Sequence, residues 1–261
     1  MKFEHTKAYN FENAIRGMRN PKNSWARSDS CFGICDVTDA AQFEQNDENK
    51  MTGWIHGDPG KLAWITDLSF PYAQYAYIGE NDMKLAQTLI RAGSEHRKFM
   101  RQIFVCVDIT APMYWWSEFD TYKVGTVANS TSKMHKLATT PITTECFEAD
   151  DISEVVDIDN KHNPATIITY CEELRQKHLE TKDKRYWKEL VRWLPESWLQ
   201  TRTVTLTYEN LLAMCSKGQR RFHKLNEWSG QDNFSLPNFI AWARRLPYAP
   251  ELIFTDEVTG V

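Results

Sequence analysis

The sequence predicts an α+β fold in which a central, largely antiparallel sheet is flanked by helices. Two segments, Gln102–Ile109 and Thr203–Thr207, alternate as strands do, and several other segments place apolar residues at helical spacing. Hydrophobic residues make up 42% of the 261 residues, which is enough for a substantial core. The length allows one large domain or two small ones, and we expect a single domain spanning residues 1–261.

The N-terminal part is predicted to begin with a helix over Asn10–Arg19, because four apolar residues there share one face. Residues 20–72 are rich in Asp, Asn, Gly and Pro, and we expect them to be irregular. A strand is expected at Ala73–Ile78, where this irregular stretch ends.

The middle of the chain is predicted to contain one helix and one buried strand. The helix covers Met83–Ala92, is capped by Asn81 or Asp82, and ends at Gly93. The strand Gln102–Ile109 is largely apolar on both faces, which predicts a central position in its sheet.

The C-terminal half is predicted to be mainly helical. The expected helices are Asn163–Thr181, Arg185–Leu194, Tyr208–Ser216 and Leu236–Leu246. Ser235 gives the last helix an N-cap signal, and Pro237 stands at an early helical position. Acidic side chains cluster between Glu145 and Asn160, where we expect a solvated loop.

Composition and charge narrow the classes of function. A formal net charge of −4 argues against binding of nucleic-acid polymers, because such binding depends on neutralising phosphates. No stretch approaches the ~20 apolar residues that span a bilayer, and the N-terminus lacks an apolar run of the signal-peptide type. The six cysteines include no Cys-x-x-Cys pair, which predicts free thiols and no metal site. We therefore expect a cytoplasmic protein that binds neither membrane nor metal.

The segment Ala111–Lys136 is the most informative candidate site. Pro112 stands at the start of a helix-like run, and an abrupt loop, Gly125–Ser132, follows with many Thr, Asn and Ser side chains. Such a loop presents hydrogen-bond donors to a phosphate or a ring edge, and Lys123 adds a cation just before it. A buried amphipathic helix followed by an ordinary turn explains the same residues, and from these residues alone it is the simpler interpretation.

The same segment resembles the signature region of the flavin-dependent thymidylate synthases. In that family a strand leads into a helix that starts with Ala-Pro and ends in Arg-His-Arg-x-x-Ser, and a Ser-x-Arg follows. Here Ala111-Pro112 follows the strand, Thr121-Tyr122-Lys123 stands in place of Arg-His-Arg, and Thr126 in place of the first Ser. Thr131 and Lys133 stand in place of the later Ser and Arg. Each of these signature positions keeps a side chain that can form polar contacts, but none keeps the residue typical of the family. This pattern indicates a distant or repurposed member.

A second stretch supports the resemblance. The family has a Leu-Pro, a strand, and then a helix with a late His and Glu. Here Leu194-Pro195 precedes the strand Thr203–Thr207, and Arg220-Arg221 and His223 come after the next helix. Arg202 matches a family arginine if one inserted residue is allowed. Guanidinium groups bind phosphate in bidentate fashion, so Arg220 and Arg221 are either phosphate ligands or exposed charges at a helix end.

The resemblance implies a fold like that of the thymidylate synthase complementing protein, and a specific chemistry. Family members are homotetramers that bind FAD, reduce it with NADPH and pass a carbon from methylenetetrahydrofolate to dUMP without a cysteine nucleophile. The residues implied to contact FAD are His96, Thr121, Tyr122, Lys123, Asn129 and His223. Those implied to contact the nucleotide are Thr126, Thr131, Ser132, Lys133, Arg202, Arg220 and Arg221. No catalytic residue is assigned.

Three interpretations stay open from the sequence. The first is a divergent flavin-dependent enzyme that acts on a pyrimidine nucleotide, and the second is a relative that binds nucleotides without flavin chemistry. The third is a structural protein whose own Trp and Tyr side chains fill the pocket. Lys123 and Lys133 offset phosphate charge only as point charges, and Tyr122 replaces an imidazole with a phenol. We favour the first interpretation because polar residues persist at most signature positions.

Overall fold

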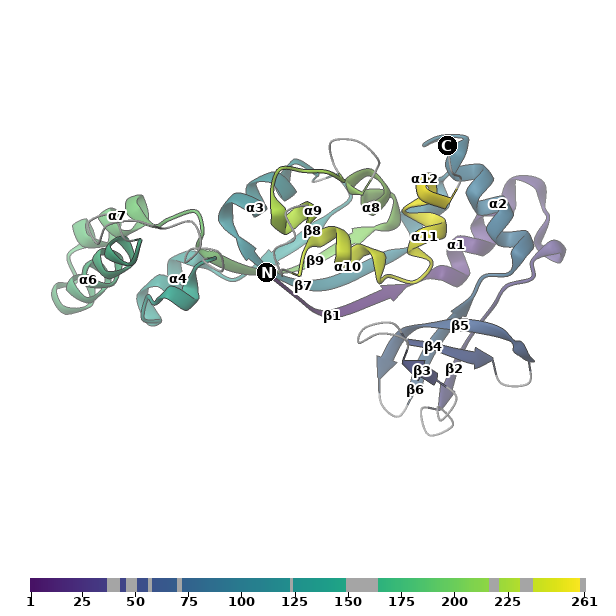
Figure 1. Ribbon diagram of the computed structural model, residues 1–261, viewed down its shortest axis with the longest axis horizontal. Coiled ribbons are helices and arrows are strands. Elements are labelled where there is room, and N and C mark those ends of the chain that lie inside the picture. Colours follow the sequence, from purple (N-terminus) through teal and green to yellow (C-terminus); the bar gives the residue numbers. More distant parts are fainter. Residues whose placement is uncertain are drawn as a thin grey trace.

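The structure is a computed structural model that describes residues 1–36, 43–45, 51–55, 58–69, 72–122, 124–148, 164–215, 221–230 and 237–258. Its centre is a four-stranded antiparallel sheet in the order β1-β7-β9-β8 (Figure 1). The strands are β1 (Lys2–Tyr9), β7 (Phe104–Pro112), β9 (Leu199–Thr207) and β8 (Val127–Ser130). Helices and antiparallel strands are mixed along the chain, which confirms the predicted fold class.

A layer of helices covers one face of this sheet (Figure 1). The helices are α1 (Phe11–Met18), α3 (Met113–Phe119), α8 (Tyr208–Met214), α9 (Asn226–Ser229), α10 (Phe239–Arg244), α11 (Ala249–Leu252) and α12 (Thr255–Val258). Val105, Val107 and Ile109 of β7 are fully buried in the core that this layer shares with the sheet. On the other face Phe104 is 39% exposed and Asp108 is half-buried. Strand β7 is central, as predicted, because it pairs along both edges and not because both faces are buried.

A second sheet occupies much of the stretch 20–72. This five-stranded antiparallel sheet has the order β2-β6-β5-β4-β3. Its strands are β2 (Cys31–Asp36), β6 (Tyr72–Tyr77), β5 (Asp58–Ser69), β4 (Met51–Ile55) and β3 (Phe43–Gln45). The prediction of an irregular segment is therefore wrong, whereas the strand predicted at 73–78 is confirmed. The prediction was wrong because glycine was taken as a sign of irregular structure. At Gly33 the glycine instead leaves room within a strand, because a Cβ there would stand only 2.7 Å from the Tyr75 hydroxyl.

The helix α2 (Glu80–Arg91) begins three residues earlier than predicted, and neither predicted cap serves as one. Asp29 supplies the cap from outside the helix, because its carboxylate accepts from the backbone N–H groups of Asn81 (2.8 Å) and Asp82 (3.1 Å). The side chain of Asp82 is instead fully buried, where it accepts hydrogen bonds from Arg19, Ser28 and Ser30.

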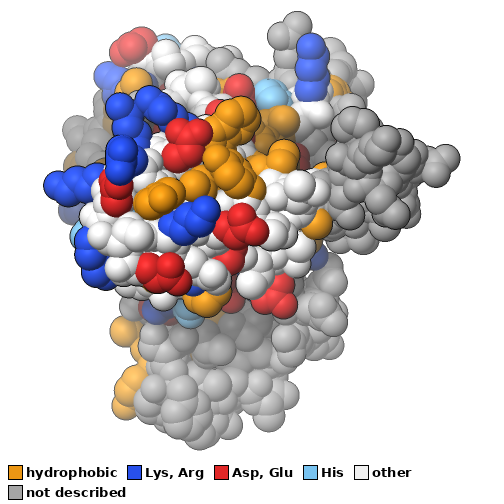
Figure 2. Space-filling view, turned by 90° about the vertical axis from the view of Figure 1, so that its left-hand side faces the viewer, with side chains coloured by type: hydrophobic (Ala, Val, Ile, Leu, Met, Phe, Trp, Pro, Cys, Tyr) orange, Lys and Arg blue, Asp and Glu red, His pale blue; other side chains and the backbone are white. Residues whose placement is uncertain are grey.

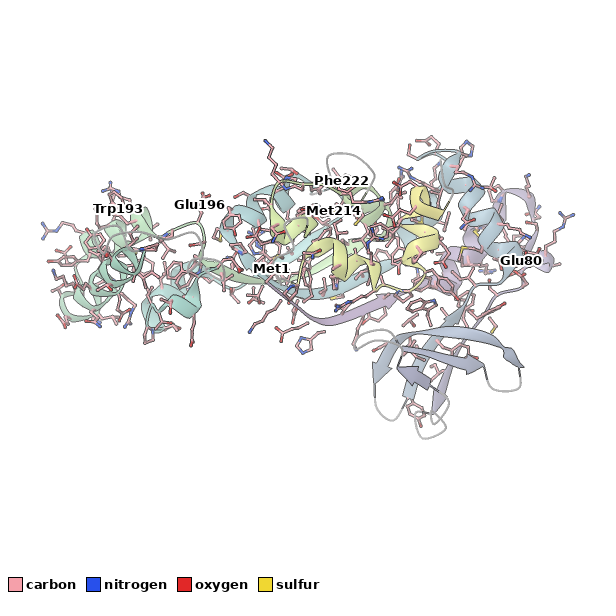
Figure 3. All side chains as sticks on the ribbon, viewed as in Figure 1. Met1, Glu80, Trp193, Glu196, Met214 and Phe222 are labelled. Atoms are coloured by element: carbon pink, nitrogen blue, oxygen red, sulfur yellow. The ribbon has the colours of Figure 1, made fainter. Side chains whose placement is uncertain are left out.

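Two long helices and a short one form a projection at one end of the four-stranded sheet (Figure 1). They are α4 (Lys133–Thr139), α6 (Ala165–Thr181) and α7 (Lys184–Trp193), and the last two confirm predicted helices within two residues. A separate core that includes Leu137, Leu174 and Leu190 holds them together. Figure 2 looks at this end of the molecule and shows hydrophobic side chains gathered on it; Trp193, labelled in Figure 3, is 57% exposed. Most of the predicted acidic loop, from 149 to 160, lies outside the described residues.

Glu172 joins α6 to the segment that follows α4. Because of this contact, we expect the projection formed by α4, α6 and α7 to lose stability at low pH. Its carboxylate accepts from the backbone N–H of Ile142 at 2.7 Å and from the guanidinium of Arg175. These bonds, the one from Arg175 foremost, lower the pKa of Glu172 to about 2. Since an unfolded Glu titrates near ~4.3, the stabilisation is complete above that pH and is lost as the pH falls toward the folded value. We expect amide hydrogen exchange in α6 to accelerate over that range, and Glu172→Gln to remove the pH dependence.

The remaining elements are short. They are the 3-10 turns η1 (Asn20–Lys22), η2 (Trp25–Arg27), η4 (Lys98–Gln102), η5 (Asp120–Tyr122) and η6 (Thr144–Cys146). Part of the predicted polar loop, Gly125–Ser132, is the edge strand β8, so that loop is shorter than predicted. Asn238 caps α10 through the backbone N–H of Ala241, while Ser235 lies outside the described residues. No helix in the described part of the chain is long and apolar enough to cross a membrane.

Candidate functional site

The first turn of α8 lies between two of the predicted site segments. Glu209 accepts hydrogen bonds from Arg97 (Nε, 3.1 Å) and from Arg101, which tie it to the turn that carries His96. The next residue, Asn210, donates from Nδ2 to the carbonyl of Val124 at 2.6 Å, directly before the loop Gly125–Ser132, which is called the signature loop below. Two neighbouring side chains therefore fix the His96 turn and the signature loop relative to each other.

Neither Glu209 nor Asn210 was among the predicted site residues. Asn210 also forms a capping box with Thr207, which begins α8 directly at the end of β9. The sequence Thr-x-x-Asn after a strand is the signal that would have found it. Partial burial opposes ionisation of Glu209, but the hydrogen bonds from Arg101 and Arg97 outweigh it and lower the pKa of this carboxyl.

A backbone feature shapes the signature loop beside Asn210. Gly125 has φ +82°, a conformation that side chains with a Cβ rarely adopt. A Cβ there would also stand 3.4 Å from the Oδ1 atom of Asn210. The chain therefore turns sharply between the end of α3 and the edge strand β8.

His96 lies on the wall of a wide cleft of about 1370 Å³. The turns η1 and η2 form one side of the cleft, and α2 and η4 form the other. Exposed cations on the wall are Lys22, Arg27 and Lys98, against which stand the carboxylates of Asp29 and Glu95. The lining is thus rich in donors and positive charge, and it is open to solvent on the His96 side.

Two predicted flavin contacts, Tyr122 and His223, meet on a third ring. Each ring centroid lies 5.5 Å from that of Trp228, which is fully buried. The Nε2 atom of His223 is 3.5 Å from a carboxylate oxygen of Glu118, and Thr121 donates to the Glu118 carbonyl at 2.7 Å. Tyr122 thus packs against the helical core rather than extending into solvent, and Lys123 lies outside the described residues.

Arg202 is held inside the chain by three groups. Its Nη1 atom donates to Asp120 Oδ1 at 2.9 Å, and its Nε atom donates to the side chain of Gln200 at 2.9 Å. The guanidinium carbon stands 4.2 Å from the ring centre of Trp116. A phosphate at this place would share or replace the contact with Asp120, which is itself 41% exposed.

Arg221 is buried and makes its contacts within the chain. Its guanidinium donates to Glu257 (2.8 Å), to Asp256 (2.6 Å) and to the carbonyl of Cys215. These partners tie the start of the 221–230 segment to α12, so Arg221 is engaged in a structural ion pair in this conformation. Arg220 lies outside the described residues.

The other predicted nucleotide contacts follow the sheet edge at β8. Asn129 is exposed and lies opposite Thr203 of β9. Thr131 and Ser132 are also exposed, and the Ser132 hydroxyl accepts from the backbone N–H of His135 in α4. Thr126 is half-buried; Lys133 begins α4, and its side chain lies outside the described residues. Within the described residues no group of three or more His, Cys, Asp or Glu side chains is arranged to hold a metal ion.

Comparison with known proteins bears on the fold. No protein-family model matches the chain, and no curated protein matches it. Among solved structures, it is similar to a flavin-dependent thymidylate synthase from Helicobacter pylori in complex with FAD and dUMP, with a TM-score of 0.54 and 15% identity over 98% of this chain and 99% of that one. A second Helicobacter pylori structure, thymidylate synthase X with FAD and dUMP, gives the same TM-score and identity over 98% of each chain. The chain therefore has a fold similar to that of a flavin-dependent thymidylate synthase, with 98% of its length covered by the comparison.

Proposed function

We propose that this protein binds FAD and a dUMP-like pyrimidine nucleotide, as a divergent flavin-dependent thymidylate synthase-like enzyme. The observation that carries the proposal is the contact of Glu209 and Asn210 with both the His96 turn and the signature loop. The family resemblance assigned both segments to the site, although they lie in different parts of the sequence. The full-length likeness to two complexes with FAD and dUMP supports the same conclusion.

The cleft beside His96 fits a flavin dinucleotide in chemistry and size. Its volume of about 1370 Å³ exceeds that of common small-ligand pockets, and a dinucleotide needs such length. Lys22 and Arg27 would pair with the diphosphate, and His96 offers a ring nitrogen at the rim. Bound FAD would supply electron transfer and carry the one-carbon group, with NADPH and methylenetetrahydrofolate as co-substrates. The chain itself binds, orients and shields the cofactor.

The proposal includes a homo-oligomer, and we expect a tetramer. Although α8 joins the two segments, neither Tyr122 of η5 nor Arg202 of β9 lines the His96 cleft. A second copy of the chain would place its own Tyr122 and Arg202 next to the His96 cleft of the first copy. Apolar side chains stand exposed near the signature segments: Val124 is 90%, Val127 65% and Phe222, labelled in Figure 3, 57% exposed. We expect light scattering at micromolar concentration to give an oligomer mass, whereas a monomer would leave the site incomplete.

Substitution of the cleft cations tests the flavin site. The double variant Lys22→Ala/Arg27→Ala should bind FAD at least about tenfold more weakly, because two charge-assisted contacts are lost. Arg91→Ala removes an exposed cation of α2 that does not line the cleft, and serves as the matched control. Fluorescence quenching of added FAD measures the affinities. Equal affinity in the double variant and the control would contradict this placement of the flavin.

Contacts that the signature side chains make within the chain favour a second candidate function, which is nucleotide binding without catalysis. Arg202 is paired with Asp120, and Tyr122 is packed on Trp228, so both are occupied before any ligand arrives. A protein that binds nucleotides without turnover would have these features. Anaerobic incubation with FAD, NADPH, dUMP and methylenetetrahydrofolate separates the two candidates. The enzyme bleaches the flavin and forms dTMP, whereas the binding protein does neither and is still stabilised by dUMP against heat.

A further inference from the structure

A second cleft lies at the opposite edge of the four-stranded sheet from β8. It has a volume of about 860 Å³ and is bounded by β1, by β5 of the second sheet, and by α10 with the segment after it. Figure 1 shows these three elements meeting where the two sheets approach each other. None of the residues assigned above to FAD or the nucleotide lines this cleft.

Specific contacts fix the second sheet against β1 and against the helical layer at this junction. The ammonium of Lys7 in β1 pairs with Asp67 in β5 at 2.9 Å. The hydroxyl of Tyr248 accepts from the backbone N–H of Ile78 at 2.8 Å and reaches the carbonyl of Ala76 at 3.2 Å. The cleft is therefore a fixed feature of the fold, at the kind of junction between two structural units where ligand sites are common.

Strand β1 is distorted where it forms the wall of the cleft. Its pairing with β7 shifts register between Glu4 and Lys7, and His5 within this bulge has φ +53°, in the left-handed region. Bulges redirect side chains, and unusual backbone at a non-glycine residue is concentrated at functional sites. The bulge places His5 and Thr6 on the cleft wall.

A carboxylate on the central strand orients the His5 ring. Its Nδ1 atom lies 3.0 Å from Asp108 Oδ2, and Thr203 donates to the other oxygen of Asp108 at 2.6 Å. These hydrogen bonds, the one from Thr203 foremost, lower the pKa of Asp108 and keep it ionised. His5 is 79% exposed, and among the described residues its Nε2 atom has no hydrogen-bond partner. The ring is thus held with one nitrogen available to a ligand.

The lining combines flat aromatic surface with cations. The rings of Phe3 and Trp242 are stacked with centroids 5.2 Å apart, and Trp64 stands on the facing wall. Lys2 and Arg245 bring positive charge to the rim, where Glu4 also lies. We propose that this cleft is a second ligand site, which takes a planar aromatic molecule bearing an acidic group.

Three probes test the ring and the charge separately by isothermal titration calorimetry. Adenosine 5′-monophosphate carries both features, adenosine lacks the charge, and ribose 5-phosphate lacks the ring. We expect the monophosphate to bind at least about tenfold more tightly than either of the other two, because each lacks one set of contacts. Equal binding of all three, or no binding of the monophosphate at millimolar concentration, would overturn the proposal.

Variants assign the binding to this cleft rather than to the His96 cleft. The double variant Lys2→Ala/Arg245→Ala should weaken binding of the monophosphate by about tenfold, and His5→Gln should weaken it several-fold. Lys84→Ala is the matched control, because Lys84 is 70% exposed on α2 and, among the described residues, forms its ion pair with Glu80. FAD affinity should stay unchanged in all of them, which separates this site from the proposed flavin site. Unchanged affinity for the monophosphate in both cleft variants would refute the assignment.

Discussion

Trp228→Ala should destabilise the protein by about 3–5 kcal/mol, the usual cost of removing a large buried aromatic side chain. Trp228 is fully buried and lies against Phe239 (4.8 Å between centroids) and Trp115 (5.6 Å) in the helical core. It also supports the rings of Tyr122 and His223. The loss should therefore lower the melting temperature by roughly 10 °C and release both candidate site residues.

Thermal unfolding followed by circular dichroism measures this effect. Trp193→Ala is the matched control, because the same side chain is 57% exposed on α7 and outside the main core. We expect it to change the free energy of unfolding by less than about 1 kcal/mol. If both variants melted at the same temperature, the core would not be organised around Trp228.

Asp82→Ala should cost about 3–5 kcal/mol, because it leaves the Arg19 guanidinium buried without its carboxylate. Arg19 is 5% exposed, and Asp82 is fully buried between it and the hydroxyls of Ser28 and Ser30. This cluster ties η1, η2 and the start of β2 to the first turn of α2. The wall of the His96 cleft depends on it, so affinity for FAD should fall together with stability.

Urea denaturation gives the free energy of unfolding for this variant, and FAD titration gives the affinity. Glu80→Ala, in the same helical turn, is the control, because the Glu80 side chain is 79% exposed. A variant at Asp82 that kept wild-type stability would show that the buried pair contributes little. One that lost stability but kept full FAD affinity would separate the flavin site from this wall.

Periodicity alone predicted the regular elements that pack on one core. The helix α1 and the strand β7 were found because Phe11, Ile15, Val105 and Val107 repeat at the spacing that burial demands. Apart from β6, the second sheet was missed because glycine interrupts β2, β4 and β5, as at Gly33, so that no alternation stands out.

The residues of the candidate site could be predicted only where a short sequence motif indicates them. Arg221 resembles a phosphate ligand in the sequence, but its partners Asp256 and Glu257 lie 35 and 36 residues further on. The contact of Glu209 with Arg101 spans 108 residues, and that of Asn210 with Val124 spans 86. Contacts at such separations depend on the tertiary fold, and no short motif encodes them.

The most direct test of the account is the visible spectrum of the purified protein after incubation with FAD and removal of free cofactor by gel filtration. The account predicts flavin absorbance that stays with the protein, and a further change of that spectrum when dUMP is added. A colourless protein that takes up no FAD, and whose melting temperature does not respond to dUMP, would contradict it.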